Sequence, residues 1–194
     1  MERMKGLSAD IEKRIVDRAR AGDRAACRQI YDWYSKYLTA VCSRFIQDRS
    51  ELGDVLQDAF VRIFGSLGGF EYRGEGSLRA WARQIAVNEA LKKLRGRKKT
   101  ASLEYMPEVP DVTEEEEEEE NVDKIPPEVL QDMIKALPEG YRTIFNLYVL
   151  EEKSHKEIAS LLGITESTSA SQLHRARALL VKKIKDYRNN KIRQ

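Results

Sequence analysis

Apolar residues recur at helical spacing along most of the chain, with polar residues between them. Two stripes of this kind run through residues 24–41 and residues 51–66, and Asp23 stands directly before the first. Apolar positions that repeat every three or four residues indicate amphipathic α-helices, and an aspartate in front of such a stripe is typical of an N-cap. We therefore predict helices over both segments, with Asp23 as the cap of the first.

A glycine-rich loop interrupts the helical pattern after the second stripe. Four glycines fall between Gly68 and Gly76, a density that is incompatible with a helix. The helical spacing resumes directly after the loop. We therefore predict that Ser77 caps a further helix, which ends near Leu94.

The last third of the chain has the pattern of a helix-turn-helix. Prolines open two predicted helices, over residues 127–137 and residues 138–150. Ser154 and Glu157 have the spacing of a capping box, in which the serine oxygen accepts from the backbone and the glutamate reaches back. The helix that they open is short and ends at a glycine, and a longer basic helix follows over about residues 166–185. This order of elements describes a helix-turn-helix.

The net charge of +2 conceals a segregation of charge along the chain. Residues 1–99 carry a balance of +8, residues 100–123 carry −11, and residues 124–194 carry +5. Two basic segments on either side of an acidic one favour a nucleic-acid partner. A solvated surface with an acidic spacer explains the same charges, so this pattern alone leaves both interpretations open.

These patterns predict an all-α protein of two small helical domains, at residues 1–99 and 127–194. A flexible acidic linker over residues 100–126 joins them. The linker contains several prolines and the unbroken run Glu114–Glu120, whose like charges repel each other and keep the segment extended. The sequence shows no β-hairpin signal and no internal repeat.

The sequence excludes several chemistries. No apolar run reaches the roughly 18 residues of a membrane-spanning helix, and no apolar stretch near the N-terminus is typical of a secretory signal. Cys27 and Cys42 form no CxxC pair, and neither His155 nor His174 has a cysteine or an acid at metal-ligand spacing. No phosphate-binding glycine loop occurs. We expect a cytoplasmic protein without membrane insertion, catalytic residues, metal or cofactor.

The longer helix of the helix-turn-helix has two different faces. The positions spaced to face the domain core are Ser169, Leu173, Ala176 and Leu180. The other side is available to a DNA major groove, which such a helix enters with its N-terminal part, and it carries Ser167, Ala170, Ser171, His174, Arg175 and Ala178. A helix bundle with a solvated face would show the same pattern.

The glycine loop and the helix after it carry a second candidate DNA site. Glycines beside Tyr72 and Arg73 let the backbone approach a ligand closely. The following helix carries polar and aromatic residues that suit the capture of unstacked bases: Trp81, Arg83, Gln84, Asn88, Lys92, Lys93 and Arg95. In isolation, Trp81 is better explained as a core residue, and the basic cluster as a solvated helix end.

Short motifs in both predicted domains follow a known pattern. In the first domain these are Asp54–Phe60, then Tyr72–Leu78 followed by Trp81 and Ile85–Asn88. In the second domain they are Leu137–Glu139, Glu157–Ala159, Leu162–Ile164 and Arg175–Arg177. They resemble regions 2 and 4 of bacterial RNA polymerase sigma factors. Two such domains in under 200 residues, without the other sigma regions, resemble the extracytoplasmic-function (ECF) subfamily.

The resemblance implies partners for both domains, and a role for each matching residue. The residues that would bind the clamp helices of the polymerase β′ subunit are Asp54, Gln57, Asp58 and Phe60. Melted minus-ten DNA would be held by Tyr72, Arg73, Ser77, Arg83, Gln84, Asn88 and Lys92. Double-stranded minus-thirty-five DNA would be read by Lys156, Thr168, Ala170, Ser171, His174 and Arg175, in a domain that also touches the polymerase β flap. An anti-sigma factor is a further candidate partner.

The recognition helix departs from the family pattern. Ser169 stands on the core-facing stripe, where we expect its hydroxyl to be buried without a partner. Ala170 and Gln172 leave the groove-facing start of the helix without charge. These departures predict weak reading of the upstream element, and hence a DNA-bound recruiter as an additional partner.

The linker has a physical role if the resemblance holds. The 24 residues of its acidic segment, 100–123, reach roughly 80 Å at about 3.3 Å each, and two turns of DNA span roughly 70 Å. The linker can therefore place two domains on two promoter elements, and its acidic run could follow a channel built for nucleic acid. A disordered spacer that its charge keeps off DNA is the alternative.

The main hypothesis is a non-enzymatic initiation subunit that directs core polymerase to promoters and promotes DNA melting. A stand-alone DNA-binding regulator needs neither the Asp54–Phe60 nor the Tyr72–Asn88 block. A nucleic-acid-modifying enzyme is the third hypothesis, against which the missing metal and nucleophile patterns argue.

Overall fold

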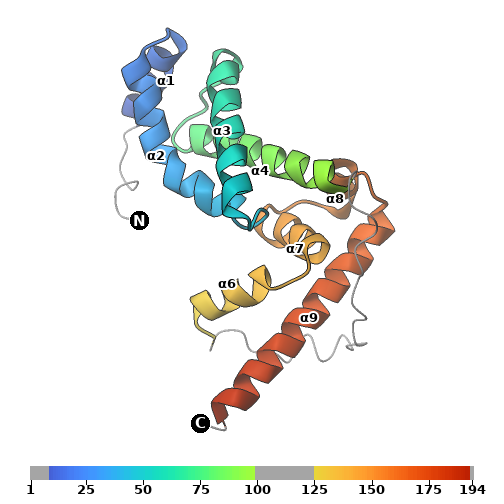
Figure 1. Cartoon of the computed structure of the whole chain (residues 1–194). Coiled ribbons are helices and arrows are strands. Elements are labelled where there is room, and N and C mark those ends of the chain that lie inside the picture. The colour runs from blue at the N-terminus through green and yellow to red at the C-terminus, as the bar shows by residue number, and fades with distance from the viewer. Residues whose placement is uncertain (1–8, 99–124, 193–194) are drawn as a thin grey trace. The chain divides into compact units, whose positions relative to one another are not determined.

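The computed structural model describes residues 9–98 and 125–192, and every regular element in these ranges is helical. The predicted all-α class is confirmed. Contacts divide the chain into two compact units, Met1–Arg97 and Lys98–Gln194, here called unit 1 and unit 2 (Figure 1). The predicted linker lies almost wholly outside the described residues. Among the described helices, none combines the length and apolar character needed to cross a membrane.

The described part of unit 1, residues 9–97, is built from four α-helices and one short 3-10 turn. These are α1 (Ala9–Arg20), α2 (Arg24–Cys42), α3 (Arg49–Ser66), the turn η2 (Leu67–Gly69) and α4 (Ser77–Lys98). The first three α-helices and α4 surround one apolar core. Its fully buried side chains include Val16, Ile30, Leu38, Phe45, Ile63 and Leu78. Each such side chain contributes about 1.5–3 kcal/mol through its removal from water.

Aspartates cap two helices of unit 1. The Asp23 carboxylate accepts from two amides in the first turn of α2 at 2.8 and 3.2 Å, which confirms the predicted cap. A hydrogen bond from Arg18 lowers the pKa of Asp23 and keeps it an acceptor. Asp48 accepts from the amide of Glu51 at 2.9 Å, so α3 begins two residues before its predicted start.

The start of α4 differs from the prediction, because Ser77 is its first residue and not its cap. The Ser77 hydroxyl donates to the carbonyl of Gly74 at 2.7 Å and so belongs to the loop. Gly76 takes the N-cap position, since its carbonyl accepts from the amide of Ala80 at 3.0 Å. Its φ of +82° lies in the region that favours glycine, which explains the residue at this point.

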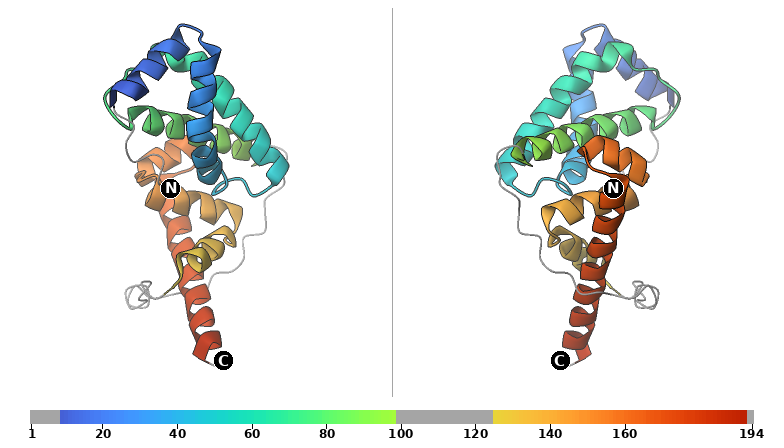
Figure 2. Two further views of the ribbon diagram at one scale, coloured as in Figure 1. Left: turned by 90° about the vertical axis from the view of Figure 1, so that its left-hand side faces the viewer. Right: turned by 90° about the vertical axis from the view of Figure 1, so that its right-hand side faces the viewer.

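Unit 2 contains the predicted helix-turn-helix. Its elements are α6 (Pro127–Lys135), α7 (Glu139–Phe145), the π-helix η4 (Asn146–Leu150), α8 (His155–Leu162) and α9 (Glu166–Ile192). The helix α6 ends earlier than predicted, because Leu137 precedes Pro138 and a residue before proline disfavours helical backbone. The helix α9 extends past its predicted end near Lys185 and is the long red helix in the views of Figure 2.

The turn between α8 and α9 has the local chemistry that the sequence predicts. Ser154 accepts from the amide of Glu157, and the Glu157 carboxylate accepts from the amide of Ser154 at 2.9 Å, so the capping box is present. Gly163 ends α8 with a φ of +67°, as is common for glycine after a helix. Leu137 and Tyr141 pack with Ala176 and Leu180, which anchors α9 in the core of unit 2.

Candidate nucleic-acid interface

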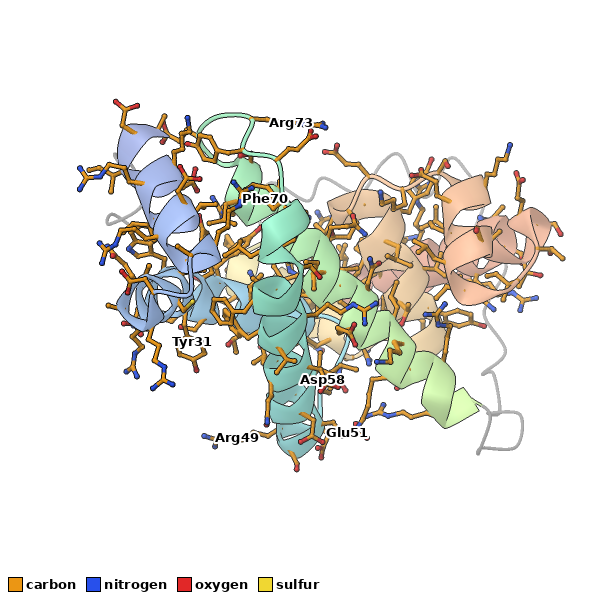
Figure 3. All side chains as sticks on the ribbon, turned by 90° about the horizontal axis from the view of Figure 1, so that it is seen from above. Tyr31, Arg49, Glu51, Asp58, Phe70 and Arg73 are labelled. Atoms are coloured by element: carbon orange, nitrogen blue, oxygen red, sulfur yellow. The ribbon has the colours of Figure 1, made fainter. Side chains whose placement is uncertain are left out.

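The exposed face of α3 carries three polar residues, as the spacing predicts. Asp54, Gln57 and Asp58 are all exposed, and Figure 3 shows Asp58 on the outside of α3. Asp54 forms an ion pair with Lys93 of α4 at 3.5 Å, in which the aspartate side chain remains 65% exposed. Exposed pairs of this kind contribute only about 0–1 kcal/mol, so a partner can replace Lys93 at little cost.

Phe60 lies on the other side of α3. Only 6% of it is exposed, and its ring packs on Tyr31 and Phe64 with centroids 4.7 and 6.0 Å apart. Its ring supports the helix from within, so the expectation that Phe60 itself contacts a partner does not fit this structure. Tyr31 of α2, by contrast, is 44% exposed, and Figure 3 labels it beside the blue ribbon of that helix.

The loop between η2 and α4 is held by its own hydrogen bonds. Ser77 Oγ accepts from the amide of Arg73 at 3.2 Å while donating to Gly74. Gly74 has a φ of +113°, which only glycine adopts easily. The Arg73 side chain is 79% exposed, pairs with Glu71 at 3.0 Å, and extends from the loop in Figure 3. The loop therefore presents a cation on an ordered turn, while the Ser77 hydroxyl is already engaged.

Tyr72 and Trp81 are both half-buried. The Tyr72 hydroxyl donates to the carbonyl of Ala9 at 2.8 Å, and burial together with nearby Glu12 raises the pKa of Tyr72. The Trp81 ring lies 4.8 Å from that of Phe70, which supports the interpretation of Trp81 as a packing residue. The hydroxyl of Tyr72 thus holds the loop against α1, in addition to any contact of its ring with a base.

Two amides of α4 form a polar pair on its surface. Gln84 and Asn88 are exposed, and Gln84 Nε2 donates to Asn88 Oδ1 at 3.2 Å. Arg83 is half-buried and, about 100° away around the helix, faces a different side. Lys92 is exposed and pairs with Glu89 at 3.1 Å. The structure therefore brings together Gln84 and Asn88 but separates Arg83 from them.

A groove of about 320 Å³ runs between α3 and α4. Its lining residues are Asp58, Val61, Arg62, Gly65, Ser66, Glu89 and Lys92. Glu89 is only 7% exposed and forms ion pairs with Arg62 at 3.6 Å and with Lys92. The groove is thus lined by both acidic and basic side chains, and the charge of the buried Glu89 is balanced by Arg62 and Lys92 within it.

The sequence prediction missed Glu12, which is buried in unit 1. Its carboxylate accepts from the Tyr34 hydroxyl at 2.7 Å and from the amide of Gly76 at 3.3 Å. Burial, followed by the bond to Glu12, raises the pKa of Tyr34 far above its usual value, so the hydroxyl stays a donor. The signal was present in the sequence, because Glu12 is spaced at helical intervals from buried Ile15, Val16 and Ala19.

Ser169 is buried as predicted, but its hydroxyl has a partner. Its Oγ lies 2.9 Å from His155 Nδ1, and this hydrogen bond joins α8 to α9. The His155 ring stacks on Tyr148 at 4.7 Å, and the guanidinium of Arg177 lies 5.9 Å from the Tyr148 ring. The prediction that this hydroxyl has no partner was therefore wrong, because its partner belongs to the preceding helix.

The start of α9 presents its predicted DNA face to solvent. The exposed residues are Ser167, Ala170, Ser171, His174 and Arg175, together with Lys156 of α8. The placement of Ala178 on this side was wrong, because its side chain is only 1% exposed and packs in the core. Thr168 is half-buried and bonds to Thr165 at 2.8 Å, and Ser171 Oγ donates to the carbonyl of Thr168 at 3.1 Å. Gln172 lies beside Gly140, so this side of α9 faces α7 within unit 2. Its lack of charge has no bearing on a DNA-facing surface.

Known protein families account for both units. A model described as Sigma-70 region 2 matches residues 30–100, and one described as Sigma-70, region 4 matches residues 128–180. These ranges contain every residue of the candidate polymerase and DNA sites above, whereas Glu12 lies outside them. Among the residues that the structure describes, no group of histidines, cysteines and acids could hold a metal ion.

Curated relatives span most of the chain. It is 28% identical over 186 residues to the RNA polymerase sigma-H factor of Pseudomonas aeruginosa, with 91% of the chain and 95% of the relative covered. It is also 28% identical over 186 residues to the ECF RNA polymerase sigma factor SigW of Bacillus subtilis, with 90% and 97% covered. The RNA polymerase sigma-E factor of Streptomyces coelicolor is 31% identical over 140 residues, with 71% and 73% covered.

Proposed function

The chain belongs to the sigma-70 family as an ECF sigma factor, a partner of core RNA polymerase and promoter DNA, and we propose which surfaces carry each step. Unit 1 binds core polymerase and opens the promoter, and unit 2 reads the upstream element. The observation that carries this proposal is the position of each family region on one unit, with most of its matching polar residues exposed. Sigma factors are initiation factors and not catalysts.

The face of α3 formed by Asp54, Gln57 and Asp58 is the proposed polymerase surface. Its acids are exposed although basic residues of α4 lie close by, and only Asp54 of the three is paired there, among the described residues. Exposed carboxylates on one helix face give an acidic surface that steers a basic partner and fixes its orientation. We propose that the clamp helices of the β′ subunit bind this face, with Phe60 supporting it from the core.

The loop at Arg73 and the α4 amides Gln84 and Asn88 form the proposed minus-ten surface. A flipped base is read through hydrogen bonds to its edge, and an exposed carboxamide offers both a donor and an acceptor. Arg73 can pair with a phosphate of the melted strand. Promoter melting is then the capture of bases that have left the stack, and it needs no catalytic group.

The start of α9 is the proposed minus-thirty-five surface. Arg175 and His174 reach the groove from the exposed face, and Lys156 can neutralise a phosphate. The bond between His155 and Ser169 fixes the angle at which α9 leaves α8. The polymerase flap is the partner proposed for this unit on the opposite side.

A DNA-bound recruiter remains part of the proposal for one reason. Ala170 is exposed at the groove-facing start of α9 and offers neither charge nor a side-chain hydrogen bond. A position that contributes no contact lowers the discrimination between upstream sequences, by about 1–3 kcal/mol for each good base contact that is missing.

Co-elution with core polymerase tests the assignment of the α3 face. Reversing Asp54 and Asp58 to lysine should weaken binding to core polymerase at least about tenfold in the absence of DNA. The matched control is Asp32→Lys on α2, where the aspartate is similarly exposed at 57% and pairs with Arg28 of its own helix at 3.2 Å. Wild-type association of the double reversal would contradict the assignment. A chain that binds DNA but never co-elutes with polymerase would instead be a stand-alone regulator.

A further inference from the structure

A buried carboxylate of α1 holds the residue at which α4 begins. Glu12 is only 4% exposed, and its two oxygens serve different elements. Oε1 accepts from the hydroxyl of Tyr34 on α2 at 2.7 Å, and Oε2 accepts from the amide of Gly76 at 3.3 Å. Burial of a carboxylate is costly unless hydrogen bonds compensate it. The second of these bonds reaches a loop 64 residues further along the chain.

Glu12 does for α4 what a capping-box glutamate does within one helix. In a capping box the side chain of the third helical residue accepts a hydrogen bond from the amide of the N-cap, as Glu157 does in α8. The third residue of α4 is Arg79, whose guanidinium lies 4.1 Å from the ring of Tyr37. A cation cannot accept from the N-cap amide of Gly76, and Glu12 accepts from it instead, from another helix.

Hydrogen bonds join the helix α1 to the start of η2, to the middle of the loop and to its end. These hydrogen bonds pair Arg20 with Leu67, Ala9 with Tyr72, and Glu12 with Gly76, at 3.0, 2.8 and 3.3 Å. A loop with two glycines at positive φ has many conformations open to it when nothing restrains it. Because α1 orders the loop before DNA arrives, less conformational freedom is lost when a base is captured.

We propose that Glu12 is a positioning residue for minus-ten recognition. Its carboxylate fixes the start of α4, and with it the direction in which Gln84 and Asn88 meet the melted strand. The inference rests on the proposed function of the loop and α4. It adds a residue that lies outside the segment matched by the region 2 model, which begins at residue 30.

Two variants separate positioning from folding. Glu12→Leu combined with Tyr34→Phe replaces both buried polar groups by apolar ones, a change that can be nearly neutral for stability. It leaves the amide of Gly76, which is exposed, without its acceptor. Glu12→Gln is the conservative variant, because its amide oxygen can accept from Gly76 while its NH2 group donates to the Tyr34 oxygen. Asp10→Asn, on the exposed side of α1, is the matched control.

Hydrogen exchange of the full chain reports on the loop without any DNA. We expect the amides of residues 70–77 to exchange at least about tenfold faster in the double variant, since a hydrogen bond to a charged acceptor is lost. Glu12→Gln and Asp10→Asn should exchange like the wild type, and the amides of α2 and α3 should not change in any variant. Unchanged exchange in the loop would overturn the proposal.

Promoter opening by each variant bound to core polymerase tests the functional part. The DNA is the promoter that the wild-type chain uses, mapped from transcript 5′ ends, as an ordinary duplex and with its minus-ten segment mismatched. We expect the double variant to open the duplex about tenfold more slowly and to bind polymerase normally. The conservative variant Glu12→Gln should open the duplex as the wild type does.

Two outcomes of this experiment overturn the proposal at different steps. If the double variant opens the duplex at the wild-type rate while Asn88→Ala remains slow, then Glu12 does not position the site. If Asn88→Ala also opens at the wild-type rate, the proposed function of the loop and α4 is wrong, and the positioning role is lost with it.

Discussion

Loss of the hydrogen bond between His155 and Ser169 should loosen the recognition helix without changing its exposed face. Ser169 is fully buried, and its Oγ lies 2.9 Å from His155 Nδ1. His155→Phe keeps a ring that can stack on Tyr148 but leaves the buried hydroxyl without this partner. Ser169→Ala removes the hydroxyl and leaves the ring nitrogen without it.

The burial of the two groups sets the expected magnitudes. A hydrogen bond contributes about 0.5–1.5 kcal/mol net, whereas a buried group left unsatisfied costs about 1–3 kcal/mol. Because water reaches half-buried His155 but not Ser169, we expect His155→Phe to cost about 2 kcal/mol and Ser169→Ala about 1 kcal/mol. The double variant should cost only about 1 kcal/mol, roughly 2 kcal/mol less than the sum, because neither polar group remains.

Thermal unfolding resolves these changes, because both tryptophans, Trp33 and Trp81, lie in unit 1. Tryptophan fluorescence therefore follows unit 1 alone, while far-ultraviolet circular dichroism follows the helices of both units. In a domain of this size, 1 kcal/mol corresponds to a shift of about 4–8 °C in Tm. His155→Phe should thus lower the unit 2 transition by about 8–16 °C and leave the fluorescence transition in place.

The double-mutant cycle decides whether the bond stabilises unit 2. Costs that add to within about 0.5 kcal/mol would show that His155 and Ser169 act independently, as distant sites do. A fluorescence transition that shifts together with the circular dichroism transition would refute the assignment to unit 2.

The remaining predictions concern DNA and pH. Asn88→Ala should slow promoter opening about tenfold without weakening polymerase binding, since one hydrogen bond to a captured base is lost; permanganate footprinting measures this, and an unchanged rate would count against base capture. Scrambling the upstream element should lower transcription by purified holoenzyme only modestly, because Ala170 makes no side-chain contact; a loss beyond about a hundredfold would show strong reading by unit 2. Hydrogen bonds from Ser154 lower the pKa of Glu157, so this cap contributes stability above the unfolded-state pKa and loses it as pH falls through the folded-state value. An acid titration of Ser154→Ala should therefore show a smaller loss of stability than the wild type, and an equal loss would contradict the role of the cap.

Features that depend on neighbouring residues were predictable from the sequence. The Asp23 cap, the capping box at Ser154 and the glycine at the end of α8 each involve groups within a few residues of one another. Their spacing in the sequence therefore contains the whole interaction. The exposed acids of α3 follow from helical periodicity in the same way.

Features that join distant segments were not predictable in this way. The local sequence predicted Ser77 as the cap of α4. The actual N-cap is Gly76, whose amide donates to Glu12 of α1, and no local rule connects these two residues. Ser169 looked unpaired because its partner, His155, is on the preceding helix at a position that no local rule connects to it. Phe60 matched a family motif, but the motif does not separate residues that contact a partner from those that support the helix within the core.

Reconstituted transcription tests the central claim most directly. Core RNA polymerase is supplied with the purified chain and genomic DNA, and the 5′ ends of the transcripts are sequenced. We predict discrete start sites that share two upstream elements, that are absent without the chain, and that disappear when Asp54 and Asp58 are both changed to lysine. The same transcripts with and without the chain would contradict its assignment as a promoter-directing subunit of the polymerase.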